Sequence, residues 1–150
     1  MAIATNIYDS AQRFLLTGGT DFALGTIRCS LHTSSGTFSA AHDTWSDVSS
    51  NEISEAKYIP LDLSLNPNEG ITLSVDPLTR VLTLDTPDID FGTDLTWTTA
   101  RHMIIRDYVN DRLLLHINLD ATQSPVSGGW KYIIDATYGL LRFGVNNGYS

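Results

Sequence analysis

The sequence predicts an all-β protein: a single antiparallel β-sandwich or jelly-roll-like domain of about eight strands, with a short N-terminal helix or arm. Two features of composition support this fold class. Val, Ile and Thr together make up 35 of the 150 residues, and their branched side chains suit a pleated sheet. The acidic residues are 14 Asp and only 3 Glu, which favours turns over the exposed faces of helices. A third feature is an apolar alternation of period two in most segments.

The N-terminal segment differs from the rest of the chain. Ile7, Ala11 and Phe14 recur at helical spacing in residues 6–17, and Asn6 is a candidate N-cap. Gly18 and Gly19 then end the pattern. We therefore expect residues 1–18 to form a helix or arm and residues 19–150 to form the β-sandwich domain.

The strands follow in order after these glycines. Ile27, Cys29 and Leu31 alternate with Arg28, Ser30 and His32 in the first strand, whereas residues 34–54 are polar, with one helical turn expected near residues 42–48. Further strands are expected at residues 59–65, 71–75, 81–85, 100–107, 112–119, 130–135 and 140–145. The predicted core-facing residues are Ile27, Leu31, Leu61, Leu63, Leu73, Leu84, Leu115, Ile117 and Leu141.

Composition excludes several classes of protein. Apolar residues form 42% of the chain, which is too many for a disordered protein, and the formal charge of −8 argues against nucleic-acid binding. No apolar run approaches the roughly 18 residues of a membrane helix, and residues 1–5 lack the pattern of a secretory signal. A single cysteine leaves no internal disulfide. These observations predict a soluble domain of a reducing compartment.

Neither a nucleophile motif nor a phosphate-binding loop occurs, so no enzyme activity and no cofactor are predicted. Cys29 alternates with apolar residues and is expected to be a buried, inert thiol. His32, His102 and His116 lie on or beside strands, opposite the apolar residues or at strand ends, and His42 lies in the polar segment. We interpret them as histidines that face solvent or another subunit and not as metal ligands.

A dense group of carboxylates occupies residues 85–94. It comprises Asp85, Asp88, Asp90 and Asp94. Aspartates at strand exits usually accept hydrogen bonds from turn backbone, which is the favoured interpretation. Oxygen-rich clusters also suit calcium, although the spacing is not that of an EF-hand loop. A bound cation therefore stays open as an alternative, but no metal site is predicted.

Several short segments carry a resemblance to a known family. They are residues 31–35 (LHTSS), Asn51 with Glu52, Tyr58, Asp85 with Asp88 and Ile89, residues 99–101 (TAR) and residues 114–119. In this order they resemble the small structural proteins of tailed-phage virions. Ile59 and Pro60 stand where that family has glycines, and the last strands match only loosely. The resemblance spans most of the chain and implies a place in the virion and a role in assembly.

Together these inferences predict a non-enzymatic virion protein, made in the host cytoplasm, most readily a capsid decoration (cement) protein that stabilises the shell. Its expected partners are the major capsid protein or other virion subunits and further copies of itself, with no nucleic acid and no membrane. The alternative is a neck, tail or fibre module that recognises host glycan. The predicted docking residues are Ile3, Ile7, Phe14, Leu15 and Leu16. The competing interpretation is that this segment closes one end of its own sheet.

Overall fold

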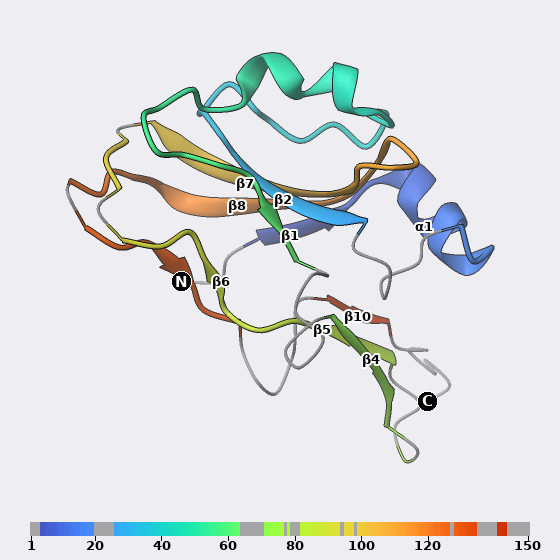
Figure 1. The fold of residues 1–150 in the computed structure, drawn as a ribbon. Coiled ribbons are helices and arrows are strands. Elements are labelled where there is room, and N and C mark those ends of the chain that lie inside the picture. The colour runs from blue at the N-terminus through green and yellow to red at the C-terminus, as the bar shows by residue number, and fades with distance from the viewer. Residues whose placement is uncertain are drawn as a thin grey trace.

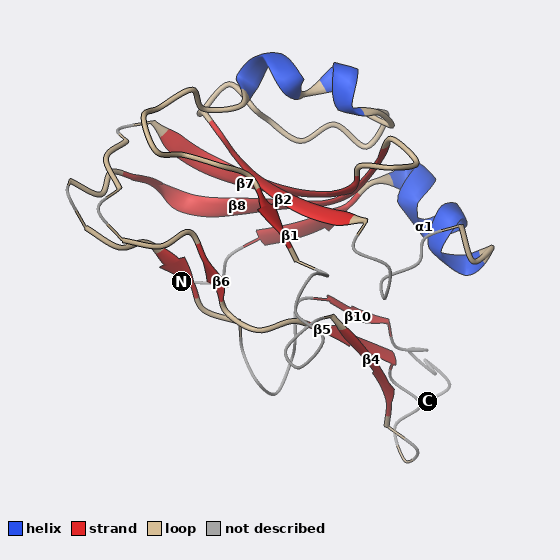
Figure 2. Ribbon diagram, in the orientation of Figure 1, coloured by secondary structure: helices blue, strands red, loops and turns tan. Residues whose placement is uncertain are grey.

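The computed structural model describes residues 4–19, 26–63, 71–76, 78, 82–93, 95–97, 99–126, 128–134 and 141–143. These residues form a mainly β structure with antiparallel sheets and one short α-helix, as the sequence predicts (Figures 1 and 2). The largest sheet has the order β1 (Ala4–Ile7), β8 (Arg112–Gln123), β7 (Ala100–Asp107), β2 (Ile27–His32) and β3 (Leu61–Asp62). The two smaller sheets pair β10 (Leu141–Phe143), β5 (Leu82–Asp85) and β4 (Thr72–Val75), and β6 (Ile89–Asp90) with β9 (Lys131–Tyr132).

A hairpin of β7 and β8 forms the centre of the largest sheet. β7 has the bounds that alternation predicts, and β8 continues four residues beyond its predicted end at residue 119. The turn between them is stabilised by the buried Asp107 carboxylate, which accepts hydrogen bonds from the backbone N–H groups of Val109 and Asn110 at 3.2 and 3.1 Å. Asp111 adopts a φ of 53°, a left-handed conformation that Asp tolerates better than most residues.

The N-terminal segment is part of this sheet. β1 pairs with β8, and α1 (Asp9–Leu16) follows it and packs against β8. The predicted helix is thus confirmed, but its start at Asn6 is wrong, because Asn6 lies in β1 opposite His116. The open edge of β8 supplies backbone hydrogen bonds to residues 4–7. The end of the helix is as predicted: Gly18 has a φ of 72°, and the N–H of Gly19 donates to the Phe14 carbonyl at 3.0 Å.

The two faces of the largest sheet differ in chemistry. One face carries apolar side chains in register, with Cys29 opposite Ile105 and Leu31 opposite Met103. These residues belong to one hydrophobic cluster with Trp97 and with residues of β5 and β6. Of the predicted core, Ile27, Leu31, Leu84, Leu115 and Ile117 are buried, Leu61 and Leu63 pack partly buried against the cluster, and the side chains of Leu73 and Leu141 lie outside the described part.

The opposite face carries the histidines and is covered by residues 33–58, which we call the covering segment (Figure 1). It contains two short 3-10 turns, η1 (Trp45–Asp47) and η2 (Ser49–Asn51), close to the predicted helical turn. The predicted strand at residues 59–65 is shorter in the structure, where only Leu61–Asp62 pair with β2; residues 64 and 65 lie outside the described part. The strands β1 and β6 were not predicted.

Candidate functional site

The structure separates the predicted docking residues. Ile7 is half-buried in β1 and packs against the hydrophobic cluster, so it serves the fold of this chain. Phe14 is half-buried on α1 and lines a pocket. Leu15 and Leu16 lie in α1, but their side chains, like all of Ile3, are outside the described part of the structure. Phe14 and its surroundings therefore define the candidate docking surface.

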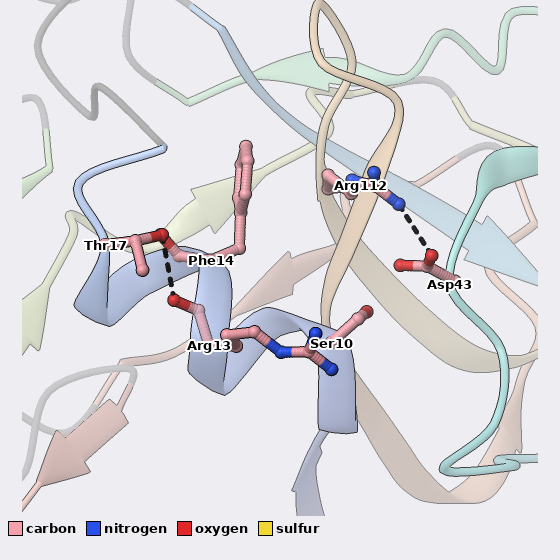
Figure 3. A pocket seen from close by; sticks show the side chains of 6 residues that line it. All are labelled: Ser10, Arg13, Phe14, Thr17, Asp43 and Arg112. Atoms are coloured by element: carbon pink, nitrogen blue, oxygen red, sulfur yellow. Dashed lines mark hydrogen bonds and ion pairs between the residues drawn. The ribbon is translucent and has the colours of Figure 1, made fainter.

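This pocket has a volume of about 180 Å³ and lies between α1, the covering segment and the start of β8 (Figure 3). Its lining residues are Ser10, Arg13, Phe14, Thr17, Asp43 and Arg112. The Thr17 hydroxyl donates to the Arg13 carbonyl at 3.0 Å, so it is occupied within the helix. The guanidinium carbon of Arg112 lies 5.8 Å from the centre of the Phe14 ring. Helix and β8 thus form the walls of one site.

An ion pair connects the covering segment to β8 at this pocket. Arg112 Nη1 lies 2.6 Å from Asp43 Oδ2, and the Leu113 N–H donates to the Asp43 carbonyl at 2.9 Å. The Ser10 hydroxyl and the Arg112 guanidinium hold the pKa of Asp43 below its ordinary value. Because both side chains are more than a third exposed, the pair itself stabilises the fold by less than about 1 kcal/mol. Asp43 therefore serves mainly to hold the covering segment next to the start of β8.

Arg13 gives the pocket its distinctive charge. Its side chain is exposed and makes no ion pair with the residues that the structure describes. Two guanidinium groups and one carboxylate leave the pocket with a positive balance in a chain whose formal charge is −8. Guanidinium groups pair readily with carboxylates in bidentate geometry. The pocket is thus suited to an acidic side chain of a partner beside an apolar contact with Phe14.

The other sequence candidates serve the structure. Cys29 is fully buried as predicted, and burial raises the pKa of its thiol. Three of the clustered aspartates accept backbone N–H groups, as the favoured interpretation expected: Asp85 from Thr86 at 2.9 Å, Asp88 from Ile134 at 3.0 Å and Asp90 from Gly92 at 2.8 Å. Asp90 also pairs with Lys131 at 3.2 Å. Asp94 lies outside the described residues.

The histidines correct one expectation. His32, His102 and His116 lie opposite the apolar face as predicted, but they are buried and do not face solvent. The covering segment shields them, which the alternation within a strand cannot reveal. Across the part of the chain that the structure describes, no three His, Cys, Asp or Glu residues are grouped to hold a metal ion. The same part of the chain contains no helix long and apolar enough to cross a membrane.

Sequence reasoning did not identify the contacts of Tyr58, which join the residues of the phage resemblance. The Leu31 N–H donates to the Tyr58 hydroxyl at 2.8 Å, and that hydroxyl donates to Glu52 Oε1 at 3.0 Å. The Thr33 N–H donates to the Asn51 carbonyl at 2.9 Å. Three segments that are separate in the sequence thus form one hydrogen-bonded unit along the edge of β2 beyond its pairing with β3, which we call the edge clasp. A tyrosine after a polar loop carries no motif that would have revealed this role.

Comparisons with known proteins add no family to this geometry: no protein-family model, no curated protein and no solved structure matches the chain.

Proposed function

We propose that this chain is a non-enzymatic structural protein of a virion and that it decorates and stabilises the capsid shell. The edge clasp carries the proposal. Several of the residues that resemble the phage family close the edge of β2 beyond β3 and fix a long polar segment on the sheet. Closing an edge prevents unwanted strand pairing, which a protein present in many copies on a particle requires. Arg101, another residue of the resemblance, also serves the fold, because it donates to the Asp120 carbonyl.

The aromatic side chains favour decoration over glycan recognition. A glycan-binding face presents aromatic rings to solvent beside polar groups. Here Tyr58, Phe91, Trp97 and Trp130 pack on one another with ring centres 5.6–6.2 Å apart, and Trp97 is fully buried. The Trp130 indole N–H already donates to Gln123 at 3.1 Å. These rings therefore stabilise the packing between the sheets.

The same packing supports the sandwich as the finer description of the fold. Residues of β5, β6 and the 95–97 segment join the hydrophobic cluster of the five-stranded sheet. In this proposal the smaller sheets form the second layer of a β-sandwich. Attachment to the shell then uses the pocket beside α1, where Arg13 receives an acidic side chain of the major capsid protein.

The experiment compares virions purified from cells that produce this chain. Quantitative mass spectrometry measures its copy number relative to the major capsid protein. A ratio of the same order as the shell subunit supports decoration, whereas a small fixed number per particle supports the neck or tail alternative. Absence from purified particles overturns the virion assignment altogether.

A second arm tests the pocket. Arg13→Glu reverses an exposed charge, and Lys57→Glu makes the same change in net charge at another exposed position. We expect Arg13→Glu to abolish binding to decoration-free capsids while Lys57→Glu binds normally. Equal binding by both variants excludes the pocket as the docking surface. A chain shortened to begin at Gly19 is a poor test, because it lacks β1 and the buried residues Tyr8 and Ala11.

A further inference from the structure

A buried layer of three histidines lies between the sheet and the covering segment. His32 comes from β2, His102 from β7 and His116 from β8, with exposed fractions of 0%, 6% and 2%. Strand register places His32 directly opposite His102, and the rings of His102 and His116 have centres 4.8 Å apart. Three imidazoles therefore share one small volume that is closed to water.

Each histidine of this layer lies against the covering segment. His116 Nε2 donates to the Gly36 carbonyl at 3.0 Å, and the Phe38 ring lies 5.6 Å from the His116 ring. The Trp45 ring meets the edge of His32 at 5.5 Å. His102 lies beside the backbone of Ser34. The segment approaches so closely at Gly36 that a Cβ there would come within 2.9 Å of the His32 side chain.

The layer is built for neutral imidazoles. In His116 the Nε2–H donates, so Nδ1 carries a lone pair, and this Nδ1 has no hydrogen-bond partner. The Nδ1 atoms of His32 and His102 also lack partners. Protonation would place a positive charge, and an N–H donor without a hydrogen-bond partner, inside this buried layer. The backbone of Val48 beside His32 and of Ser34 beside His102 favours the charged form, but burial outweighs this effect. Burial lowers the pKa of all three, that of His32 to about 3, and their mutual repulsion adds to the effect for His32 and His102.

The surrounding charges do not compensate such a proton. On the sheet, Arg28 pairs with Asp62, while Arg106 stacks at 3.8 Å on the Trp45 ring and adds positive charge. Arg101 and Arg112 lie on β7 and β8, the strands of His102 and His116. The covering segment contributes His42, Lys57 and four carboxylates, of which Glu55 is one and the other three are already engaged. Those are Asp43 with Arg112, Asp47 with the backbone of residues 43 and 44, and Glu52 with Tyr58.

We propose that His32, His102 and His116 form an acid-sensitive lock for residues 33–48, the part of the covering segment that lies against them. Protonation of the cluster releases residues 33–48 from the sheet, while Tyr58 and the opposite, apolar face stay packed. Release separates Asp43 from Arg112, because Asp43 belongs to the segment and Arg112 to β8. Mild acid thereby also alters the pocket beside α1. This inference rests on the buried layer and is independent of the proposed function.

The expected effect of pH on the opening equilibrium can be calculated from His32 alone. His32 has an ordinary pKa of 6.5 that folding lowers to about 3, and opening restores the ordinary value. Lowering the pH from 7.5 to 5 therefore raises the equilibrium constant for opening by about 30-fold through His32 alone. His102 and His116 act in the same direction.

Hydrogen exchange of the full chain, followed by mass spectrometry at pH 7.5 and 5 and corrected for intrinsic rates, tests the lock. We expect peptides within residues 33–48 to lose at least 30-fold in protection at pH 5 while peptides of β7 and β8 stay protected. Unchanged protection of the segment refutes the proposal. Loss of protection by segment and sheet together also refutes it, because that result is global acid unfolding.

Substitutions of the histidines provide a second test of the lock. His32→Gln with His116→Gln keeps a hydrogen-bonding amide at each position and removes the charge, so the segment should stay protected at pH 5. His42→Gln removes a histidine of the segment outside the cluster and should open like the parent. If the double variant does not fold, NMR titration of the parent histidines decides. Opening of the segment that coincides with titration of the three cluster histidines supports the lock, and titration without opening overturns it.

Discussion

Replacing Tyr58 by Phe removes one hydroxyl from the edge clasp and leaves its ring in place. That hydroxyl accepts from the Leu31 N–H and donates to Glu52, so the variant loses two hydrogen bonds at once. The ring contacts persist, because Phe91 and Trp97 lie 6.0 and 6.2 Å from the Tyr58 ring centre. The variant therefore separates the clasp from the packing around it.

The expected cost comes mainly from the backbone donor that is left without a partner. Leu31 is fully buried, and an unsatisfied buried N–H costs about 1–3 kcal/mol. The lost bond to Glu52 adds about 1 kcal/mol. We expect the free energy of unfolding to fall by about 2–4 kcal/mol in total. For a chain of this size that lowers Tm by roughly 5–12 °C.

Urea and thermal unfolding followed by circular dichroism measure this change. Tyr108→Phe is the matched control: its ring stacks under Arg28 at 4.0 Å, and no hydrogen bond involves its hydroxyl within the described residues. That control should unfold within about 0.5 kcal/mol of the parent. A Tyr58→Phe variant as stable as the control would refute the clasp, because the Leu31 N–H would then have found another partner.

Three further outcomes follow from the buried groups. Trp97→Ala should lower the free energy of unfolding by about 3–5 kcal/mol in urea titrations, because it removes a fully buried indole from the hydrophobic cluster. Cys29 should not react with a thiol reagent in the native protein and should react fully in denaturant; rapid native labelling would contradict its burial. The free energy of unfolding should fall as the pH drops below 6.5, since the unfolded state then binds more protons than a folded state in which the pKa of His32 is about 3. His32 alone accounts for about 2 kcal/mol at pH 5, and a His32→Gln variant with an unchanged pH profile in urea titrations would contradict this.

Local patterns predicted the strands because each strand has one apolar face. Alternation fixed the bounds of β7, and it placed Ile27, Leu31 and Ile117 in the core. The same rule failed at Asn6, where a helical spacing of apolar residues coincided with a strand of the sheet. Pairing of β1 with β8 depends on residues more than a hundred positions apart, and no local pattern reports such a contact.

The histidine face shows the same limit in another form. Period two places His32 and His102 opposite the apolar residues, and the structure confirms that side. Whether solvent or a loop covers that side is decided by tertiary structure. The unusual length of the polar segment after β2 was the available signal, because a long ordered connection has to lie on some surface of its own domain. The hydrogen bonds of Tyr58 cannot be predicted before the position of the polar segment on the sheet is known.

The two faces of the sheet respond differently to their surroundings because they are stabilised differently. The apolar face loses nothing on acidification, since its cluster contains no group that gains a proton near neutral pH. The histidine face buries three imidazoles whose Nδ1 atoms have no hydrogen-bond partner, and this burial disfavours the charged form. Val48 and Ile53 of the covering segment are also buried in the hydrophobic cluster, but the groups whose protonation opposes the folded state lie on the histidine face. Asp43 and Arg112 connect that side to the pocket beside α1, so the proposed partner of Arg13 would bind next to a contact that opening of the covering segment breaks. By reciprocity of linkage, a partner that contacts both the segment and α1 must also hold the segment closed against acid.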